Sequence, residues 1–213
     1  YEIPLRLVGS EMCIRDSRNT LALNQVSMSV MQGDIYGFIG ENGAGKTTMI
    51  RLLTGLAEPT TGKIALFGES NKKLAKQRDR IGCIIESPSL YLDMTAYENL
   101  EVQRLQRGIP GKGCIDNALA LVGLKDTGKK KAKDFSLGMR QRLALAIALL
   151  GNPEFLVLDE PINGLDPTGI IELRNLLKRL NKERGITILI SSHILTELHQ
   201  LANRYGILHE GKL

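Results

Sequence analysis

The sequence predicts an α/β protein with a mostly parallel central sheet covered by helices. From Leu21 onward, short runs rich in Val and Ile alternate with helical patterns, as they do where crossover helices join parallel strands. Hydrophobic residues make up 43% of the chain but aromatic residues only 4%, so the core must be built from aliphatic side chains. With 213 residues the chain is long enough for one substantial domain, or for a core with one inserted subdomain.

The first strand and the first helix flank a glycine-rich turn. We expect the strand at residues 34–39 and the helix at residues 46–54, where Gly55 ends it. A further strand leads up to Glu86.

The middle of the chain, about residues 88–134, lacks strong strand signals. It carries helical patterns around residues 96–107 and 115–122. We therefore predict an α-helical subdomain inserted into the sheet domain.

The strand pattern then resumes. Residues 155–158 and 186–190 are short apolar runs typical of fully buried parallel strands, and residues 205–208 indicate a last strand. An amphipathic helix is expected at residues 168–183, with Gly185 just past its end. Its predicted inner side consists of Ile170, Ile171, Leu173, Leu176, Leu177 and Leu180.

The two ends of the chain look different from the rest. Residues 7–17 resemble the in-frame translation of a sequencing adapter, so we expect residues 1–17 to be foreign to the domain. The domain proper is expected to span residues 18–213. We expect it to be incomplete at both ends, because the sequence stops at Leu213 directly after a strand and a turn.

Composition limits the classes of function. No stretch approaches the roughly 20 apolar residues that a membrane-spanning helix needs, so a membrane role would require a partner protein. The three cysteines, Cys13, Cys83 and Cys114, form no Cys-x-x-Cys pair, which favours a reducing cytosol over zinc or disulfide chemistry.

The formal net charge of +5 is modest. The densest basic run, Lys129 to Lys131 with Lys133, has no interleaved aromatic residue on which a base could stack. We interpret it as a solvated loop, and expect no nucleic-acid partner.

Residues 40–47 match the phosphate-loop pattern Gly-x-x-x-x-Gly-Lys-[Ser/Thr], between a predicted strand and a predicted helix. Glycines let the backbone wrap an anion, and the helix start directs N–H groups at phosphate. Lys46 adds a full positive charge, and Thr47 offers its hydroxyl to Mg²⁺. The predicted nucleotide contacts are Gly40, Asn42, Gly43, Ala44, Gly45, Lys46, Thr47 and Thr48.

The motif alone does not separate transporters from GTPases, kinases or helicases. The alternative to a binding loop is a glycine-rich turn that matches the pattern by chance.

Two acids follow the apolar run at residues 155–158, so they emerge at the carboxyl end of a central strand, where open α/β sheets place ligands. Asp159 is predicted to hold Mg²⁺. Glu160 is predicted to act as the general base toward water, a role typically worth about 10² to 10⁴ in rate. The structural alternative is that the two acids cap the strand or the next helix.

Residues 135–142, Phe-Ser-Leu-Gly-Met-Arg-Gln-Arg, open a helix and resemble the signature of the ABC transporter ATPases, Leu-Ser-Gly-Gly-Gln. Leu137 and Met139 depart from that signature. Ser136 is predicted to cap the helix. In the family the signature faces the nucleotide held by a second subunit, so the resemblance implies that Ser136 and Gly138 contact ATP across a dimer.

Other segments follow in the order of this family. Residues 163–166 look like the loop that contacts the partner subunit, and residues 191–193 look like the switch segment, which makes His193 a catalytic candidate beside the γ-phosphate. A lone histidine would otherwise be structural. His199 and His209 have no such placement and are expected to be surface residues.

Glu86 occupies the position at which most of this family carries a Gln that touches Mg²⁺ and the membrane subunit. With its neighbours it makes the chain similar to exporters of bacitracin and lantibiotic peptides. The resemblance implies a metal-contacting and coupling role for Glu86; the alternative is a salt-bridged hinge residue.

The family stacks adenine on an aromatic residue near position 15 or 16, where this chain has Arg15 and Asp16. As written, the sequence should lose a stacking contact of about 1 to 3 kcal/mol.

The resemblance implies a subunit that binds and hydrolyses ATP with Mg²⁺ and couples this to export, with peptide antibiotics as candidate substrates. The implied partners are a membrane-spanning subunit and a second ATPase subunit, in a homodimer or a heterodimer. The implied location is cytoplasmic, peripheral to the inner face of the membrane. Two alternatives stay open, an ABC ATPase acting on ribosomes or DNA and an inactive regulatory subunit.

Overall fold

A computed structural model describes residues 5–7, 14–15, 21–86 and 89–213 of the chain. Its central sheet has five strands in the order β11-β5-β10-β9-β8, and every neighbouring pair is parallel. The strands are β5 (Ile35–Gly40), β8 (Ile81–Ile84), β9 (Phe155–Asp159), β10 (Thr187–Ser192) and β11 (Arg204–Leu208). The predicted fold class, a mostly parallel sheet with helices, is confirmed.

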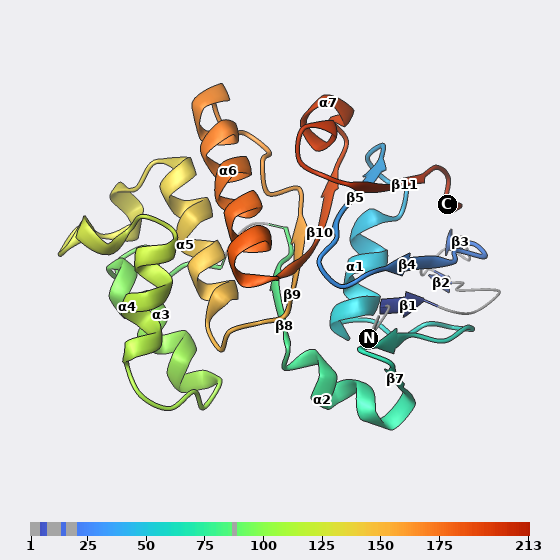
Figure 1. The fold of residues 1–213 in the computed structure, drawn as a ribbon, viewed down its shortest axis with the longest axis horizontal. Coiled ribbons are helices and arrows are strands. Elements are labelled where there is room, and N and C mark those ends of the chain that lie inside the picture. The colour runs from blue at the N-terminus through green and yellow to red at the C-terminus, as the bar shows by residue number, and fades with distance from the viewer. Residues whose placement is uncertain (1–4, 8–13, 16–20, 87–88) are drawn as a thin grey trace.

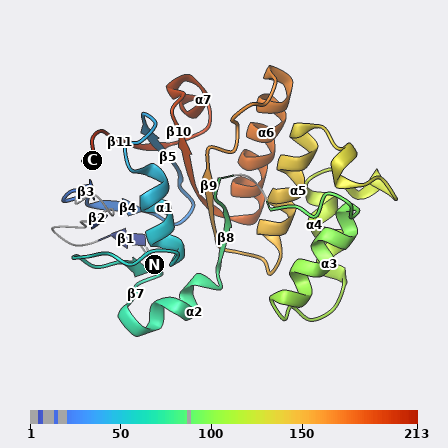
Figure 2. The same cartoon turned by 180° about the vertical axis from the view of Figure 1, so that it is seen from behind.

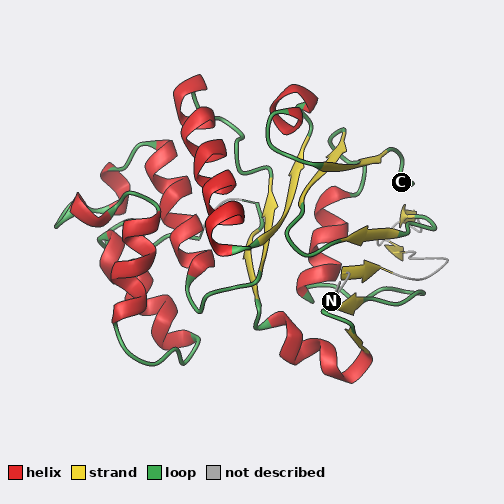
Figure 3. Cartoon of the chain, in the orientation of Figure 1, coloured by secondary structure: helices red, strands yellow, loops and turns green. Residues whose placement is uncertain are grey.

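Helices cover both faces of this sheet (Figures 1 and 3). Helix α1 (Lys46–Thr54) lies on one face, and α5 (Leu137–Leu149) and α6 (Pro167–Arg184) lie on the other. Strand β9 shows why, because Leu156 and Leu158 enter the core beneath α5 and α6, whereas Val157 enters the core beneath α1. This alternation is the period-2 geometry of a strand, and it fills two separate aliphatic cores.

Helix α1 has the predicted bounds, Lys46–Thr54. It ends because Gly55 adopts a left-handed conformation with φ of 81°, from which its N–H bonds back to the last turn. Among the described helices, none combines the length and the apolar character that crossing a bilayer requires.

The segment predicted to be an inserted subdomain contains α3 (Ala96–Gln106) and α4 (Gly113–Leu121), followed by the short helices η2 (Lys125–Thr127) and η3 (Ala132–Asp134). Figure 2 shows it on the far side of α5 from the sheet. Both predicted helices are therefore present, each within two residues of its expected bounds. Helix α3 starts at a capping box, in which the Thr95 side chain and the Glu98 backbone and carboxylate pair reciprocally.

Shorter elements complete the chain. The strands β1 (Leu5–Leu7) and β4 (Met28–Val30), β2 (Ile14–Arg15) and β3 (Leu21–Leu23), and β6 (Ala65–Leu66) and β7 (Glu69–Ser70) form three antiparallel pairs. The remaining helices are η1 (Asn71–Lys73), α2 (Leu74–Arg78) and α7 (Leu195–His199).

Residues 1–17 are described only at β1 and β2. Their predicted foreign origin therefore stays a prediction, and Cys13 and Asp16 lie outside the described residues. Of Arg15 only the backbone is described, so the predicted loss of the adenine-stacking contact also stays a prediction.

The prediction that Ile171 of α6 faces the core is wrong. The side chains of Leu173, Leu176, Leu177 and Leu180 are buried, but Ile171 is 47% exposed. At about 100° per residue, position 171 lies some 200° from position 173 and so outside the stripe that faces the sheet. Ile170, three residues before Leu173, is half-buried against the core.

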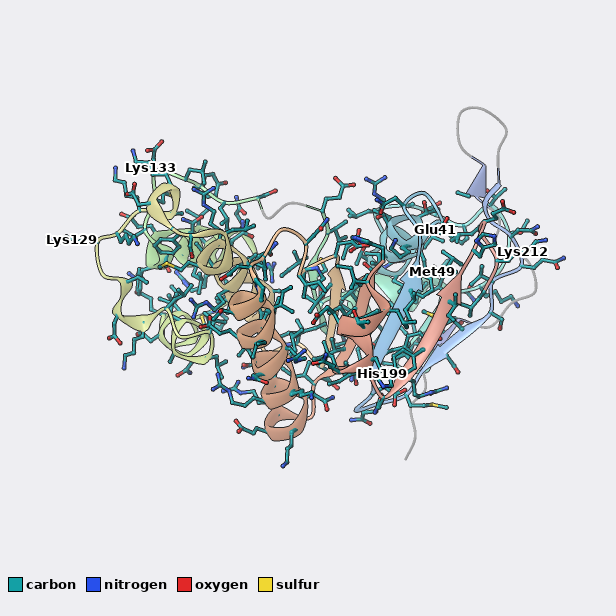
Figure 4. The ribbon with its side chains drawn as sticks, turned by 90° about the horizontal axis from the view of Figure 1, so that it is seen from above. Glu41, Met49, Lys129, Lys133, His199 and Lys212 are labelled. Carbon is teal, nitrogen blue, oxygen red and sulfur yellow. The ribbon has the colours of Figure 1, made fainter. Side chains whose placement is uncertain are left out.

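The basic run lies at the tip of the subdomain. Figure 4 places Lys129 and Lys133 far from Glu41 of the glycine-rich turn. All four lysines of the run are exposed, as expected of a solvated loop. The two histidines predicted to lie on the surface, His199 and His209, are exposed as well.

Asn99 is a buried polar residue of α3 that binds the backbone of the segment just before this helix. The residue is only 1% exposed. Its side-chain amide accepts from the Tyr91 N–H at 2.8 Å, and it donates to the carbonyls of Tyr91 at 3.0 Å and Thr95 at 2.9 Å.

We expect Asn99→Ala to lower the free energy of unfolding by about 1–3 kcal/mol, because it removes these hydrogen bonds and leaves the Tyr91 N–H without its acceptor. Asn117→Ala, at an exposed position of α4, is the matched control and should change it by less than about 0.5 kcal/mol. Urea denaturation measures both. Equal effects of the two substitutions would contradict the assignment of Asn99 as a structural anchor.

Candidate functional site

The turn between β5 and α1 depends on glycine conformations. Gly45 has φ of 108°, and a Cβ there would lie 2.6 Å from the Ala22 carbonyl oxygen. Gly43 also has a positive φ, of 85°, and has no other atom within 4 Å of the place where a Cβ would lie. Gly45 therefore fixes the turn, and Gly43 leaves open space beside its backbone.

The amino end of α1 has no side-chain cap. In contrast, Ser136 caps α5 by accepting from the Met139 N–H, and Asp166 caps α6 by accepting from the Gly169 N–H. The first-turn N–H groups of α1 therefore rely on something other than a capping side chain, and such a helix end suits an anion.

Lys46 brings a positive charge into the same turn. The residue is 5% exposed, and its Nζ donates to the Gly40 carbonyl at 2.6 Å and the Glu41 carbonyl at 3.0 Å. Nζ also lies 3.2 Å from Glu160 Oε1. The loop residues and Lys46 are thus brought together as the motif predicted.

Thr47 and Asp159 meet where α1 faces the end of β9. The Thr47 hydroxyl donates to Asp159 Oδ2 at 2.7 Å, and Asp159 is 4% exposed. Within the described part of the chain, no three His, Cys, Asp or Glu residues form a metal-binding cluster. Mg²⁺ at phosphate sites commonly uses only one or two protein carboxylates together with substrate phosphates, so this hard-oxygen pair fits the ion.

Glu160 and His193 also come together. Glu160 Oε2 lies 2.9 Å from His193 Nδ1, and Glu160 adopts the left-handed region with φ of 48°. Its other oxygen, Oε1, is buried and accepts no hydrogen bond, although the Lys46 ammonium is near. The carboxylate thus sits in a strained turn between an ammonium and an imidazole, and it could accept a proton from water if one of these partners moved away.

Glu86 pairs with a residue that the sequence did not indicate. Its carboxylate forms an ion pair with Arg51, one turn beyond Thr47 on α1, and its backbone has a positive φ of 58°. This ion pair agrees with the alternative interpretation of Glu86 as a salt-bridged hinge residue. A metal-contacting role for Glu86 stays a prediction.

Ser136 and Gly138 stand apart from the phosphate loop of their own chain, because α5 and α1 cover opposite faces of the sheet. The predicted cap at Ser136 is confirmed, with Oγ 3.2 Å from the Met139 nitrogen. Leu137, one of the two departures from the signature, lies beside the loop that precedes α6. A Cβ added to Gly164 of that loop would lie 3.2 Å from Leu137 Cδ2.

A cavity of about 480 Å³ lies away from the phosphate loop. Its lining includes Phe67, together with Arg80 and Glu154, which precede β8 and β9 at the amino ends of these strands. The phosphate loop follows the carboxyl end of β5, at the opposite edge of the sheet.

Fold and loop together define a phosphate-loop nucleotide-binding protein, and comparisons with known proteins narrow the class. The sequence model of the family described as ABC transporter matches residues 23–163. Over 193 residues the chain is 54% identical to the bacitracin transport ATP-binding protein BcrA of Bacillus licheniformis, with 90% of this chain and 63% of that protein covered. The chain therefore belongs to the ABC transporter family, and it spans somewhat less than two thirds of this relative.

Two further similarities agree. The chain is 46% identical to the lantibiotic transport ATP-binding protein SrtF of Streptococcus pyogenes, over 90% of this chain and 82% of that protein. A solved dimeric structure of the ATP-binding cassette MJ0796, bound to ADP and Pi, superposes with a TM-score of 0.84 at 25% identity, covering 98% of this chain and 95% of that one. The predicted resemblance to the bacitracin and lantibiotic branch is confirmed.

Gly45→Ala should lower the free energy of unfolding by more than about 1 kcal/mol, because alanine resists the required φ and its Cβ would meet Ala22. Gly113→Ala is the control, at the start of α4 with nothing within 4 Å and an ordinary φ, and should leave stability unchanged or raise it by about 0.4–1 kcal/mol. Thermal unfolding measures both. A Gly45→Ala protein as stable as the parent would refute the proposed backbone constraint.

Proposed function

We propose that this chain binds and hydrolyses ATP and that it drives a separate membrane subunit of an exporter. The observation that carries the proposal is the uncapped start of α1, with the buried Lys46 ammonium beside it and the Thr47–Asp159 pair at its side. A helix end, an ammonium and two hard oxygen atoms are complementary to a magnesium-bound triphosphate.

In this proposal Gly43, Gly45 and the first-turn N–H groups bind the β-phosphate, and Lys46 binds the β- and γ-oxygens. Thr47 and Asp159 would hold Mg²⁺, which when bound neutralises charge on the phosphates. Lys46 must then turn from Glu160 toward phosphate, which leaves the Glu160 carboxylate free to accept a proton.

Glu160 is proposed to accept the proton of the attacking water, and His193 to orient that water and the terminal phosphate. The 2.9 Å contact between the two side chains supports a shared task. To accept the proton and to orient the water, Glu160 and His193 must both lie within hydrogen-bond distance of the same water molecule.

A second chain completes the site in this proposal. Ser136 and Gly138 lie across the sheet from the phosphate loop of their own chain, so they can serve a nucleotide only if it is held by another subunit. The dimeric form of the MJ0796 cassette supports such an arrangement. The proposed partner is a second copy or a related chain.

The transported substrate is proposed by analogy with the named relatives, which are a bacitracin transport and a lantibiotic transport ATP-binding protein. Peptide antibiotics are therefore the candidate substrate class. The subdomain at residues 88–134 and Glu86 are proposed to contact the membrane subunit, which would hold the chain at the cytoplasmic face of the membrane.

Glu160→Gln should reduce phosphate release by about 10²- to 10⁴-fold while it preserves ATP binding, because the amide keeps the shape but does not accept the proton. A dimer should accumulate with ATP, as seen by size-exclusion chromatography. Glu183→Gln, at an exposed position of α6, should behave as the parent protein does. Unchanged turnover in Glu160→Gln would remove Glu160 from the base role.

Glu86→Gln and Arg51→Gln separate the two hypotheses for Glu86. If Glu86 contacts the metal, only Glu86→Gln should change the Mg²⁺ concentration that gives half-maximal phosphate release. If the ion pair only holds a hinge, both substitutions should have the same small effect, because exposed ion pairs contribute about 0–1 kcal/mol. Magnesium titrations of both variants decide.

A further inference from the structure

Ser191 is a fully buried serine in the middle of the sheet. It is 0% exposed and lies on β10 directly opposite Asp159 of β9 in the parallel register. Register partners in neighbouring strands point to the same face. That face is the one covered by α1, because Leu189 and Val157, two residues earlier on each strand, lie in the core beneath that helix.

The hydroxyl of Ser191 joins the two acids of the site. It donates to Asp159 Oδ1 at 2.5 Å and accepts from the Glu160 backbone N–H at 2.9 Å. The direction of both bonds is fixed, since the backbone N–H can only donate and the single hydroxyl hydrogen is then left for the carboxylate.

Each oxygen of Asp159 therefore has its own hydroxyl partner. Ser191 bonds Oδ1, and Thr47 bonds Oδ2 at 2.7 Å. With both oxygens held, the carboxylate keeps one orientation, and its Oδ2 side faces the Thr47 oxygen that would share the ion.

We infer that Ser191 is a positioning residue for the metal. It orients Asp159 toward Thr47, and it anchors the backbone of Glu160 at the point where the chain enters the left-handed turn with φ of 48°. One sheet hydroxyl thus sets both the proposed metal ligand and the proposed base. The inference rests on the proposed function, and it adds a residue to which neither the sequence motif nor any comparison assigns a role.

Removal of an outer partner of a metal ligand typically weakens metal binding by about 10- to 100-fold. The direct measurement is the affinity of a fluorescent, non-hydrolysable ATP analogue with Mg²⁺ and again with EDTA. The ratio of the two affinities is the metal-dependent gain, and it does not require turnover.

Ser191→Ala should reduce that gain by about 10- to 100-fold and leave the affinity in EDTA nearly unchanged. Ser191→Cys should also reduce it, since a thiol fills the same space but donates weakly. Ser191→Thr keeps the hydroxyl and should retain the gain.

Ser192→Ala is the matched control. Ser192 is equally buried on the same strand, but its hydroxyl accepts from the Ile194 N–H. It lies two residues after Ile190, which is in the core beneath α5 and α6, so Ser192 lies on the opposite face of the strand from Ser191. This variant should retain the full gain.

A full metal-dependent gain in both Ser191→Ala and Ser191→Cys would overturn the inference alone. An equal loss in Ser192→Ala would also overturn it, because the effect would then be general to the strand. A parent protein without any metal-dependent gain would overturn the proposed function and the inference together. Circular dichroism of each variant confirms that the measured protein is folded.

Discussion

Parallel pairing of β5, β10 and β9 is the constraint on which the rest of the site depends. Strand β5 lies more than a hundred residues before β9 and β10 in the sequence, yet all three strands end at the same edge of the sheet, so the phosphate loop, the acids and His193 meet there. Burial of the aliphatic strands on both faces supplies the stability that holds polar groups in place at this edge.

The charged groups of the site pair with one another. Lys46 is buried with carbonyls of its own loop and with the Glu160 carboxylate, and Glu160 in turn contacts His193. A buried ammonium needs such partners, because isolated charges are costly to remove from water. In the proposed function, phosphate oxygens replace Glu160 as partners of Lys46, so nucleotide binding would free the carboxylate that we propose as the base.

The local motifs were predictable because each has a local cause. The bounds of α1 follow from Gly45 and Gly55, whose backbone conformations end regular structure on either side. The cap at Ser136 follows from hydroxyl chemistry at a helix start. In the same way Asp159 and Glu160 could be placed at the end of β9, since the buried apolar run ends where these polar residues begin.

The partners in two contacts between distant segments were not predicted. The Glu86–Arg51 pair joins residues 35 positions apart, and the Ser191 hydroxyl reaches Asp159 only in one register of β10 against β9. A shift by one residue would turn Ser191 to the other face of the sheet. Ile171 was misplaced for a different reason, since its place on the helix, about 200° from Leu173, already lies outside the buried stripe.

Isothermal titration of the protein with ATP in the presence of magnesium tests the central claim most directly, with Lys46→Met as the comparison. The account predicts saturable binding by the parent chain below millimolar nucleotide, and a marked loss of affinity when the ammonium in the phosphate loop is replaced by an uncharged side chain of similar length. Absence of binding by the parent protein at millimolar ATP, or equal binding by the Met variant, would contradict it.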